Sequence, residues 1–213
     1  MNQALFNALR TGAILLVFTV VGTGLLAFTF DRTRNMIAAN EAKEKVALIN
    51  EVLPTRLYDN DILADAVTLP PNAGLGTLHP SQAYRARLHG QPSALVLEVI
   101  APDGYNGAIN LLVAIRTNGE LAGVRVVTHK ETPGLGDYIE IAKSAWIRQF
   151  DGAALANTAE SQWQVKKDGG RFDYVTGATI TPRAVVKSVQ RALRYYEQEG
   201  SRLFTPPAAK ESP

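Results

Sequence analysis

Residues 11–30 form an uncharged and mostly apolar run with the sequence TGAILLVFTVVGTGLLAFTF. As a helix, this run is just long enough to span a hydrocarbon core of about 30 Å. A cleaved signal peptide is the alternative, but the run is longer than the usual apolar region of a signal peptide. In addition, no cleavage site flanked by small residues follows it before Asp31 and Arg32. We therefore expect a retained transmembrane helix at residues 11–30.

The composition narrows what the rest of the chain can do. The 213 residues allow one soluble domain besides the membrane helix. A net charge of +2 argues against a nucleic-acid-binding surface, so no nucleic acid is expected as a partner. The absence of Cys excludes disulfides, thiolate catalysis and Cys-ligated zinc or iron–sulfur sites. The three His residues, at positions 79, 89 and 129, show no metal-ligand spacing.

Hydrophobic periodicity and turn residues predict the elements that follow the apolar run. A helical pattern over residues 33–53 ends at Pro54, which indicates a stalk helix at residues 31–54. A loop is expected at residues 70–74, where Pro, Asn and Gly cluster. We expect strands at residues 84–88 and 94–100 around a turn at residues 90–92. Two more strands, at residues 109–116 and 121–128, flank Asn118-Gly119, a strong hairpin signal.

The second half of the chain predicts more helix than strand. We expect a helix at residues 138–150 and a hairpin of residues 162–167 and 171–175. The last helix runs from Pro182 to about Glu199, and residues 206–213 form a short, polar, disordered tail. Strands combined with segregated helices are typical of the α+β class. The sequence therefore predicts one α+β domain at residues 55–205, with antiparallel hairpins.

The stretch at residues 173–181, Asp-Tyr-Val-Thr-Gly-Ala-Thr-Ile-Thr, carries three threonine hydroxyl groups directly before an amphipathic helix. Thr181 is a good N-cap residue, and Pro182 suits the first helical position because its missing N–H is not needed there. The free N–H groups and partial positive charge of a helix N-terminus can bind a phosphate. An ordinary capped helix accounts for the same pattern, so the residue chemistry alone indicates no more than a candidate anion site.

The order Asp-x-x-Thr-Gly-Ala-Thr at residues 173–179 resembles the covalent flavin attachment motif of FMN-binding domains in membrane redox complexes. In that family, a dedicated flavin transferase joins the FMN phosphate to the hydroxyl of the last Thr through a phosphoester. The resemblance implies that Thr179 is the attachment residue here. The other matching positions are Asp173, Thr176, Gly177 and Ala178.

Two further segments resemble the same family. One is the Gly-rich turn at residues 104–109, and the other is His-Lys-Glu-Thr-Pro-Gly-Leu-Gly-Asp at residues 129–137. In the family, the second segment lies against the flavin, which implies cofactor contacts at Glu131, Thr132, Leu135 and Gly136, with Thr181 beside them. Glu131 would serve equally as a cap of the helix that follows. His129 is expected to be a structural loop residue and not a catalyst.

With these segments, the chain resembles the G subunits of Rnf (Rsx) electron-transport complexes, which are related to the C subunit of the sodium-pumping NADH:quinone oxidoreductase. The resemblance implies an electron-transfer subunit with covalent FMN, in a complex that couples electron flow to ion translocation. It implies the other membrane subunits and a flavin transferase as partners. Because nothing in the sequence resembles a general base, metal site or activated nucleophile, we do not expect a stand-alone enzyme.

The resemblance also implies an orientation in the cell inner membrane. Residues 1–10 would be cytoplasmic and the soluble domain periplasmic. The charges oppose this weakly, because only Arg10 precedes the apolar run whereas Arg32 and Arg34 follow it. Two other functions stay open on the sequence alone: a membrane-anchored anion- or nucleotide-binding module without covalent flavin, and a structural assembly subunit.

Overall fold

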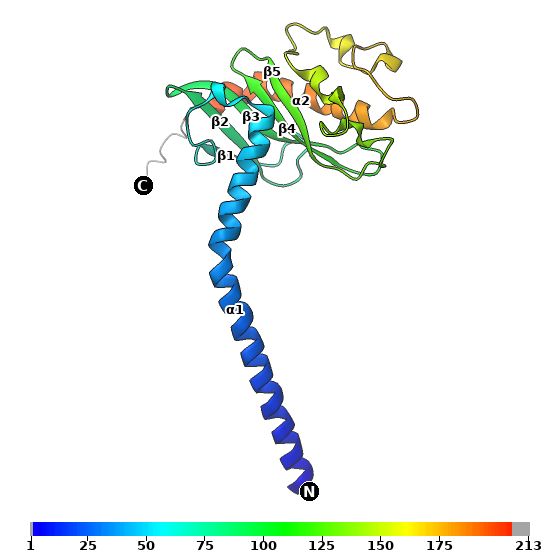
Figure 1. Ribbon diagram of the computed structural model, residues 1–213. Helices are drawn as coiled ribbons and strands as arrows, with labels where there is room; N and C mark the ends of the chain where they lie inside the picture. The colour runs from blue at the N-terminus through cyan, green and yellow to red at the C-terminus, as the bar shows by residue number, and fades with distance from the viewer. Residues whose placement is uncertain (1, 206–213) are drawn as a thin grey trace. The chain divides into compact units, whose positions relative to one another are not determined.

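The computed structural model describes residues 2–205, which form two compact units that meet between Lys45 and Val46 (Figure 1). Helix α1 (Asn2–Val52) provides all of the first unit and contributes its last residues to the second. The expected disordered tail, residues 206–213, lies outside the described residues.

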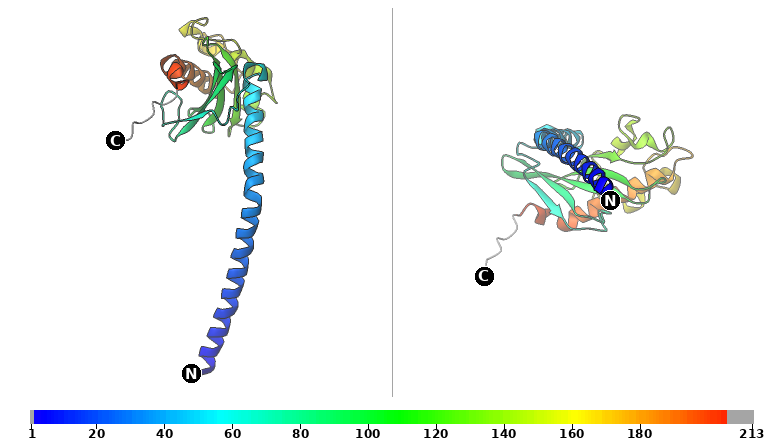
Figure 2. Two further views of the ribbon diagram at one scale, coloured as in Figure 1. Left: turned by 90° about the vertical axis from the view of Figure 1, so that its left-hand side faces the viewer. Right: turned by 90° about the horizontal axis from the view of Figure 1, so that it is seen from below.

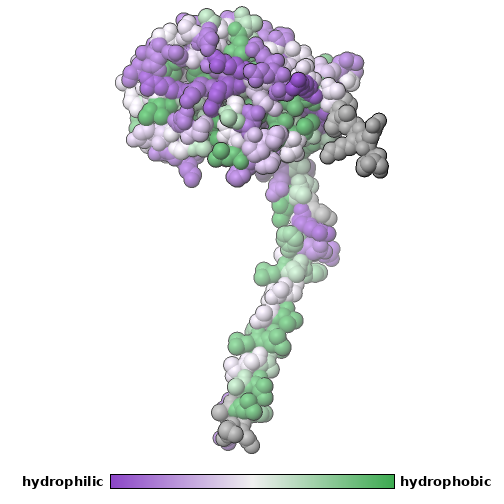
Figure 3. Space-filling view, turned by 180° about the vertical axis from the view of Figure 1, so that it is seen from behind, coloured by the Kyte–Doolittle hydropathy of each residue, from purple (hydrophilic) through white to green (hydrophobic). Residues whose placement is uncertain are grey.

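The first unit is a helix that is apolar on all sides over most of its length. Its apolar side chains are exposed at consecutive positions, as Leu16 at 65% and Phe18 at 73% illustrate. Figure 3 shows apolar residues along the face of the helix that it draws. The helix contains one stretch, of mean hydropathy 2.3, that is long and apolar enough to cross a membrane. Such a helix has no single face to bury against a protein core, so its composition suits a bilayer. It continues without a break through the range expected to form the stalk.

The second unit is built on one antiparallel meander, with the strand order β1-β2-β3-β4-β5. The strands are β1 (Ala66–Leu69), β2 (Ser81–Leu88), β3 (Gln91–Ala101), β4 (Ile109–Arg116) and β5 (Leu121–Thr128). Helix α2 (Ile180–Leu203) covers one face of this sheet, and the last turns of α1 cover the other (Figure 2). The predicted α+β class is confirmed.

Both faces of the sheet are apolar because side chains alternate between them along each strand. Leu95 and Leu97 of β3 belong to the core beneath α2, together with Val185 and Val189 of that helix. Val96, between them in sequence, belongs to the core on the opposite face. That second core also contains Ile49, Val52, Tyr84, Leu112 and Ala114. A strand buried on both faces has a nearly continuous apolar sequence, as residues 94–97 show.

The β4–β5 hairpin is confirmed with the predicted bounds, whereas the β2–β3 hairpin differs in its turn. Its connecting residues are His89 and Gly90, with φ of 52° and 75°, and Gln91 already pairs with Leu88. Positive φ at both central residues matches the right-handed twist of the flanking strands. Pro92, expected in the turn, lies inside β3. Strand β1 was not predicted, because its four residues are too short for a clear alternation.

Two predictions in the second half of the chain are wrong. In place of a helix at residues 138–150 there are two short 3₁₀ helices, Asp137–Ile139 and Ala145–Phe150, separated by extended backbone at Glu140 and Ser144. In place of the hairpin at residues 162–175 there are 3₁₀ turns and one isolated parallel bridge between Val165 and Phe172. Short 3₁₀ turns bury apolar residues at similar spacings to an α-helix, so the pattern did not distinguish them.

Candidate functional site

The attachment loop, defined here as residues 173–179, leads from the last 3₁₀ turn into α2. It contains a tight turn, in which the Ala178 amide donates to the Val175 carbonyl at 3.0 Å. Gly177 has φ of 90°, the left-handed conformation that the third position of such a turn requires and that glycine adopts without strain. Upstream, the indole N–H of Trp146 donates to the Asp173 carbonyl at 2.6 Å. The loop is therefore held at its start and folded tightly in its middle.

Helix α2 begins two residues earlier than predicted. The N-cap residue is Thr179, and Thr181, which was expected there, lies inside the first turn. Thr181 is not the cap because the helix has already begun before it; its hydroxyl donates to Oε2 of Glu131, and the residue is 1% exposed. The Thr179 side chain makes no capping hydrogen bond, although the residue is only 9% exposed. A threonine at this position usually caps, so its hydroxyl is left for another partner.

The three segments that the sequence analysis picked out meet at the start of α2. Glu131 accepts from the Asn106 amide at 3.0 Å through Oε1, and from Thr181 through Oε2. The Asn106 side chain donates to the Thr132 hydroxyl at 3.0 Å. Because these bonds join residues far apart in sequence, the Gly-rich turn, the loop at residues 129–137 and the first turn of α2, which follows the attachment loop, form one structural site.

The other predicted contacts lie around this junction in different environments. The backbone amides of Leu135 and Gly136 donate to the Thr132 carbonyl at 3.1 and 2.9 Å. Leu135 is 49% exposed, whereas Gly136 is buried. Thr176 and Gly177 are exposed, and Ala178 is buried. Asp173 lies at the far end of the attachment loop, where its carboxylate pairs with Lys166. The structure therefore does not bring the Asp173 side chain together with Glu131 and Thr181.

Sequence reasoning missed Tyr138 as a member of the site. Its hydroxyl donates to the Ala178 carbonyl at 3.4 Å and accepts from the Val175 amide at 3.4 Å. One phenol thus contacts both ends of the turn before Thr179. Nothing in the local sequence marks Tyr138, since it was expected only as the first residue of the helix predicted at residues 138–150.

His129 has the contacts of a loop-ordering residue. Its Nδ1 accepts from the Glu131 amide at 2.9 Å, so its proton lies on Nε2, which is 2.5 Å from Oε1 of Glu140. Both ring nitrogens are engaged within the loop, so they hold the backbone that carries Glu131.

The residues at the start of α2 fit a phosphate-bearing flavin. The first-turn N–H groups of a helix lack intrahelical partners and carry partial positive charge. Thr179, a buried residue, lies at this end of α2 without a side-chain capping bond. A side chain at Gly177 would meet no atom within 4 Å, so there is open space beside the turn. Four exposed apolar side chains belong to the three segments and to the start of α2: Tyr105, Leu135, Val175 and Ile180.

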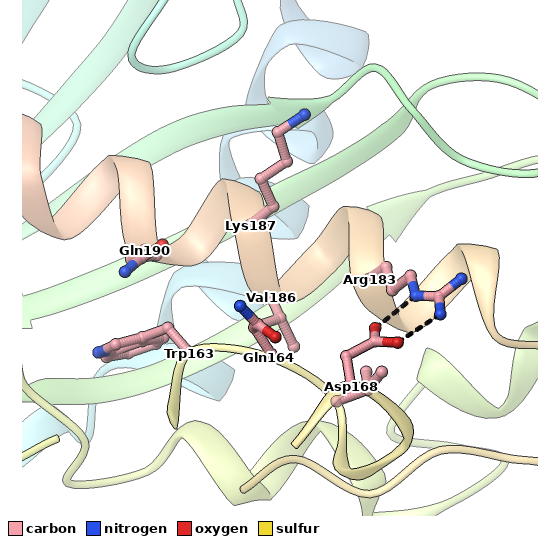
Figure 4. A pocket seen from close by; sticks show the side chains of 8 residues that line it. Trp163, Gln164, Asp168, Arg183, Val186, Lys187 and Gln190 are labelled. Carbon is pink, nitrogen blue, oxygen red and sulfur yellow. Dashed lines mark hydrogen bonds and ion pairs between the residues drawn. The ribbon is translucent and has the colours of Figure 1, made fainter. Parts of the chain in front are cut away.

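A hollow of about 280 Å³ beside α2 lies apart from this junction and is lined by Trp163, Asp168, Arg183 and Lys187, among others (Figure 4). Its cations are already paired. Arg183 makes two hydrogen bonds of 2.6 Å with Asp168, and Lys187 contacts Asp103 at 2.9 Å. The Arg183 guanidinium holds the pKa of Asp168 below its usual value. The hollow therefore offers no unpaired positive charge to an anion.

Two family models match the chain. Residues 104–194, which include all three loops of the site, match the FMN-binding domain, and residues 1–52 match the RnfG N-terminal region. The G subunit of the ion-translocating oxidoreductase complex of Pseudomonas aeruginosa is 50% identical over 204 residues, which cover 95% of each chain. The chain belongs to the G-subunit family of these complexes. The resemblance inferred from the motifs is thereby confirmed.

Other members of the G-subunit family show the same extent of similarity. The protein of Vibrio cholerae serotype O1 is 47% identical over 198 residues, covering 93% of this chain and 94% of its own. That of Shewanella oneidensis is 44% identical over 199 residues, with the same coverage. The similarity thus includes the membrane helix as well as the FMN-binding domain.

Proposed function

We propose that this chain is a membrane-anchored electron-transfer subunit of an ion-translocating oxidoreductase complex and that it carries FMN as a phosphoester on Thr179. Membership of the G-subunit family and the match to the FMN-binding domain support the role and the cofactor. The observation that carries the attachment site is the position of Thr179, buried at the N-cap of α2 with no capping hydrogen bond.

The environments of the neighbouring hydroxyls support Thr179 over Thr176 and Thr181. Thr181 already donates its hydroxyl hydrogen to Glu131 in the first turn of α2. Thr176 is exposed in the turn, three residues before the N-cap. An ester on Thr179 would place the phosphate at the N-cap of the helix, where the macrodipole and the free N–H groups would stabilise its charge.

Bound FMN supplies the electron-accepting and electron-donating chemistry, and the protein supplies its position and surroundings. The first turn of α2 would hold the phosphate. Leu135, Val175 and Ile180 would offer exposed apolar surface to the ring system, with Thr132, Gly136, Gly177 and Ala178 on the same segments. Tethering keeps the flavin on the domain through repeated cycles of oxidation and reduction.

The proposed location is the inner membrane, with α1 as a single span and the domain on the periplasmic side. The proposed partners are the other subunits of the complex, because the relatives are subunits of an ion-translocating oxidoreductase complex, and a flavin transferase that attaches the cofactor. The soluble domain needs no separate membrane-binding surface, because the apolar stretch of α1 provides the anchor.

The test is to isolate the full chain from its own membrane and map the flavin by peptide mass spectrometry. Ester formation joins the Thr179 Oγ to phosphorus: the threonine hydroxyl loses its hydrogen and the FMN phosphate loses one hydroxyl group. The peptide therefore gains FMN less one water. Thr179→Ala should abolish flavin fluorescence in the denatured protein, and Thr179→Ser should retain part of it. The fold should survive Thr179→Ala, because no capping bond is lost and the cost stays below about 1 kcal/mol.

Two results would contradict the proposal. An adduct on Thr176 or Thr181 would show that the attachment site is wrong. A denatured chain without flavin fluorescence would favour a non-covalent binding module or a structural subunit.

A further inference from the structure

Glu131 is a buried carboxyl group whose two oxygens contact different loops. It is 4% exposed, and its partners Asn106 and Thr181 lie 25 and 50 residues away in sequence. Within residues 2–205, neither Lys nor Arg forms an ion pair with it. A buried carboxyl group is costly unless its oxygens are hydrogen-bonded, so these two contacts are what make its burial tolerable.

Two glycines leave the space that the Glu131 side chain occupies. A Cβ on Gly104 would lie 3.0 Å from Oε1 of Glu131 and 2.2 Å from the Gly107 carbonyl oxygen. A Cβ on Gly136 would lie 2.9 Å from the Glu131 Cβ and 3.0 Å from Oε2. The 2.2 Å contact with backbone at Gly104 and the 2.9 Å contact at Gly136 are too short for any other residue without rearrangement. Glycine at these two positions therefore lets the Gly-rich turn and the loop at residues 129–137 lie close to the Glu131 side chain.

The Thr179 backbone lies between two held points. On its N-terminal side, the Ala178 carbonyl accepts from Tyr138 at 3.4 Å. On its C-terminal side, Thr181 is held through its hydroxyl by Glu131. Both oxygens of Glu131 accept hydrogen bonds and its side chain is buried, so it holds the first turn of α2 from inside the domain. Leu135, by contrast, is exposed on the surface.

We propose that Glu131 is a positioning residue for flavin attachment: through Thr181 and Asn106 it fixes the first turn of α2 so that the Thr179 hydroxyl is presented to the transferase in one geometry. This inference rests on the proposed function. It adds to the two roles expected from the sequence, a flavin contact and a helix cap, because the carboxyl group contacts a side chain of α2 and the backbone of a distant turn.

The test follows the rate at which covalent flavin appears on the full chain in its own membrane, with the flavin transferase present. The probe is fluorescence of the denatured protein band, divided by the amount of protein. Glu131→Ala should slow attachment about tenfold, as expected when a hydrogen bond to a carboxylate no longer orders the reacting group. Glu131→Gln should restore a rate close to that of the unsubstituted chain. Its amide has the same length, and the Thr181 hydroxyl can turn to accept from it.

Thr181 provides the second arm of the test. Thr181→Val should slow attachment as Glu131→Ala does, and Thr181→Ser should not. The double variant should be no slower than the slower single variant, because both remove the same contact. If Glu131→Ala does not accumulate as folded protein, the test rests on the other two variants: Thr181→Val should slow attachment, and Glu131→Gln should not.

Ser188→Ala is the matched control. Ser188 is also on α2, is 1% exposed, and accepts a hydrogen bond from Arg191 at 2.9 Å, away from the attachment loop. It should leave the attachment rate unchanged. Equal slowing by Ser188→Ala, or failure of Glu131→Gln to restore the rate, would overturn the positioning role.

The two proposals fail in different ways. Full attachment at an unaltered rate in folded Glu131→Ala protein would overturn the positioning role alone. Absence of covalent flavin from the unsubstituted chain would overturn the proposed function, and this inference with it.

Discussion

Tyr138 shows how one side chain can order the backbone of a site without carrying chemistry. Its hydroxyl bonds to Val175 and Ala178, on either side of the left-handed Gly177. Burial favours the neutral phenol and raises the pKa of Tyr138 to about 12, while the hydrogen bond from the Val175 amide acts in the opposite direction. The turn is therefore held by a group that stays protonated well above neutral pH.

Tyr138→Phe should lower the free energy of unfolding by about 1–2 kcal/mol near neutral pH, because it leaves the Ala178 carbonyl and Val175 amide without this partner. The pKa of Tyr138 rises from 10.0 in the unfolded chain to about 12 in the folded protein, so the neutral phenol contributes its full stabilisation below pH 10. That contribution is lost as the pH rises toward the higher pKa. The gap between the two proteins in urea unfolding should therefore narrow between about pH 10 and pH 12.

Tyr105→Phe is the control for that experiment, since Tyr105 is 65% exposed and should change neither stability nor its pH dependence. A gap for Tyr138→Phe that stays constant across the alkaline range would show that the phenol is not the titrating group.

Helix α2 is held to the domain by unlike interactions on its two faces. Val185 and Val189 pack into the main core, whereas Arg183 and Lys187 pair with Asp168 and Asp103 from separate loops. Such exposed ion pairs each contribute little, whereas each buried aliphatic side chain contributes about 1.5–3 kcal/mol. The apolar face thus determines that α2 docks, and the ion pairs order the loops that cross it.

The last turns of α1 dock on the opposite face of the sheet through a close backbone approach. A Cβ on Gly123 of β5 would lie only 2.6 Å from the Val52 carbonyl oxygen. Because that neighbour is backbone, it cannot move aside without shifting the end of the helix. The sheet therefore requires glycine at this position for the helix to lie as it does.

Gly123→Ala should destabilise the second unit by about 1–3 kcal/mol, measured by urea or thermal unfolding, because the added methyl group overpacks this contact. Gly24→Ala is the matched glycine control, since a Cβ there would meet no atom within 4 Å. An unfolding free energy unchanged by Gly123→Ala would show that the end of α1 is not closely packed on β5.

At the scale of the whole molecule, the apolar stretch of α1 carries the membrane anchor and the second unit carries the cofactor site. The orientation of the span has two opposing indications. Arg10 precedes the apolar stretch, whereas Arg32 and Arg34 follow it. By the positive-inside rule, this excess weakly favours a cytoplasmic location for the domain. The proposed function requires the periplasmic side.

We expect an alkaline phosphatase reporter fused after Pro213 to be active, because that enzyme requires the oxidising periplasm. A fluorescent reporter that matures only in the cytoplasm, fused at the same position, should stay dark. The reverse pair of results would place the domain in the cytoplasm and contradict the proposed location.

Much of this protein follows from local sequence. The β4–β5 hairpin was predicted with its bounds because apolar strands and an Asn-Gly turn act over a few residues. The membrane helix candidate follows from apolar length alone. The order Asp-x-x-Thr-Gly-Ala-Thr identified the candidate attachment residue, since the motif is contiguous and needs no tertiary contact to be recognised.

Tertiary structure decided what the local pattern left open. Residues 138–150 and 162–175 have apolar spacings that suit several structures, and packing of Trp146, Phe150 and Phe172 selected short 3₁₀ turns. The helix start at Thr179 and the burial of Glu131 depend on partners distant in the chain. No window of sequence contains both ends of those contacts. The candidate site therefore became defined only when folding brought the three loops together around one carboxyl group.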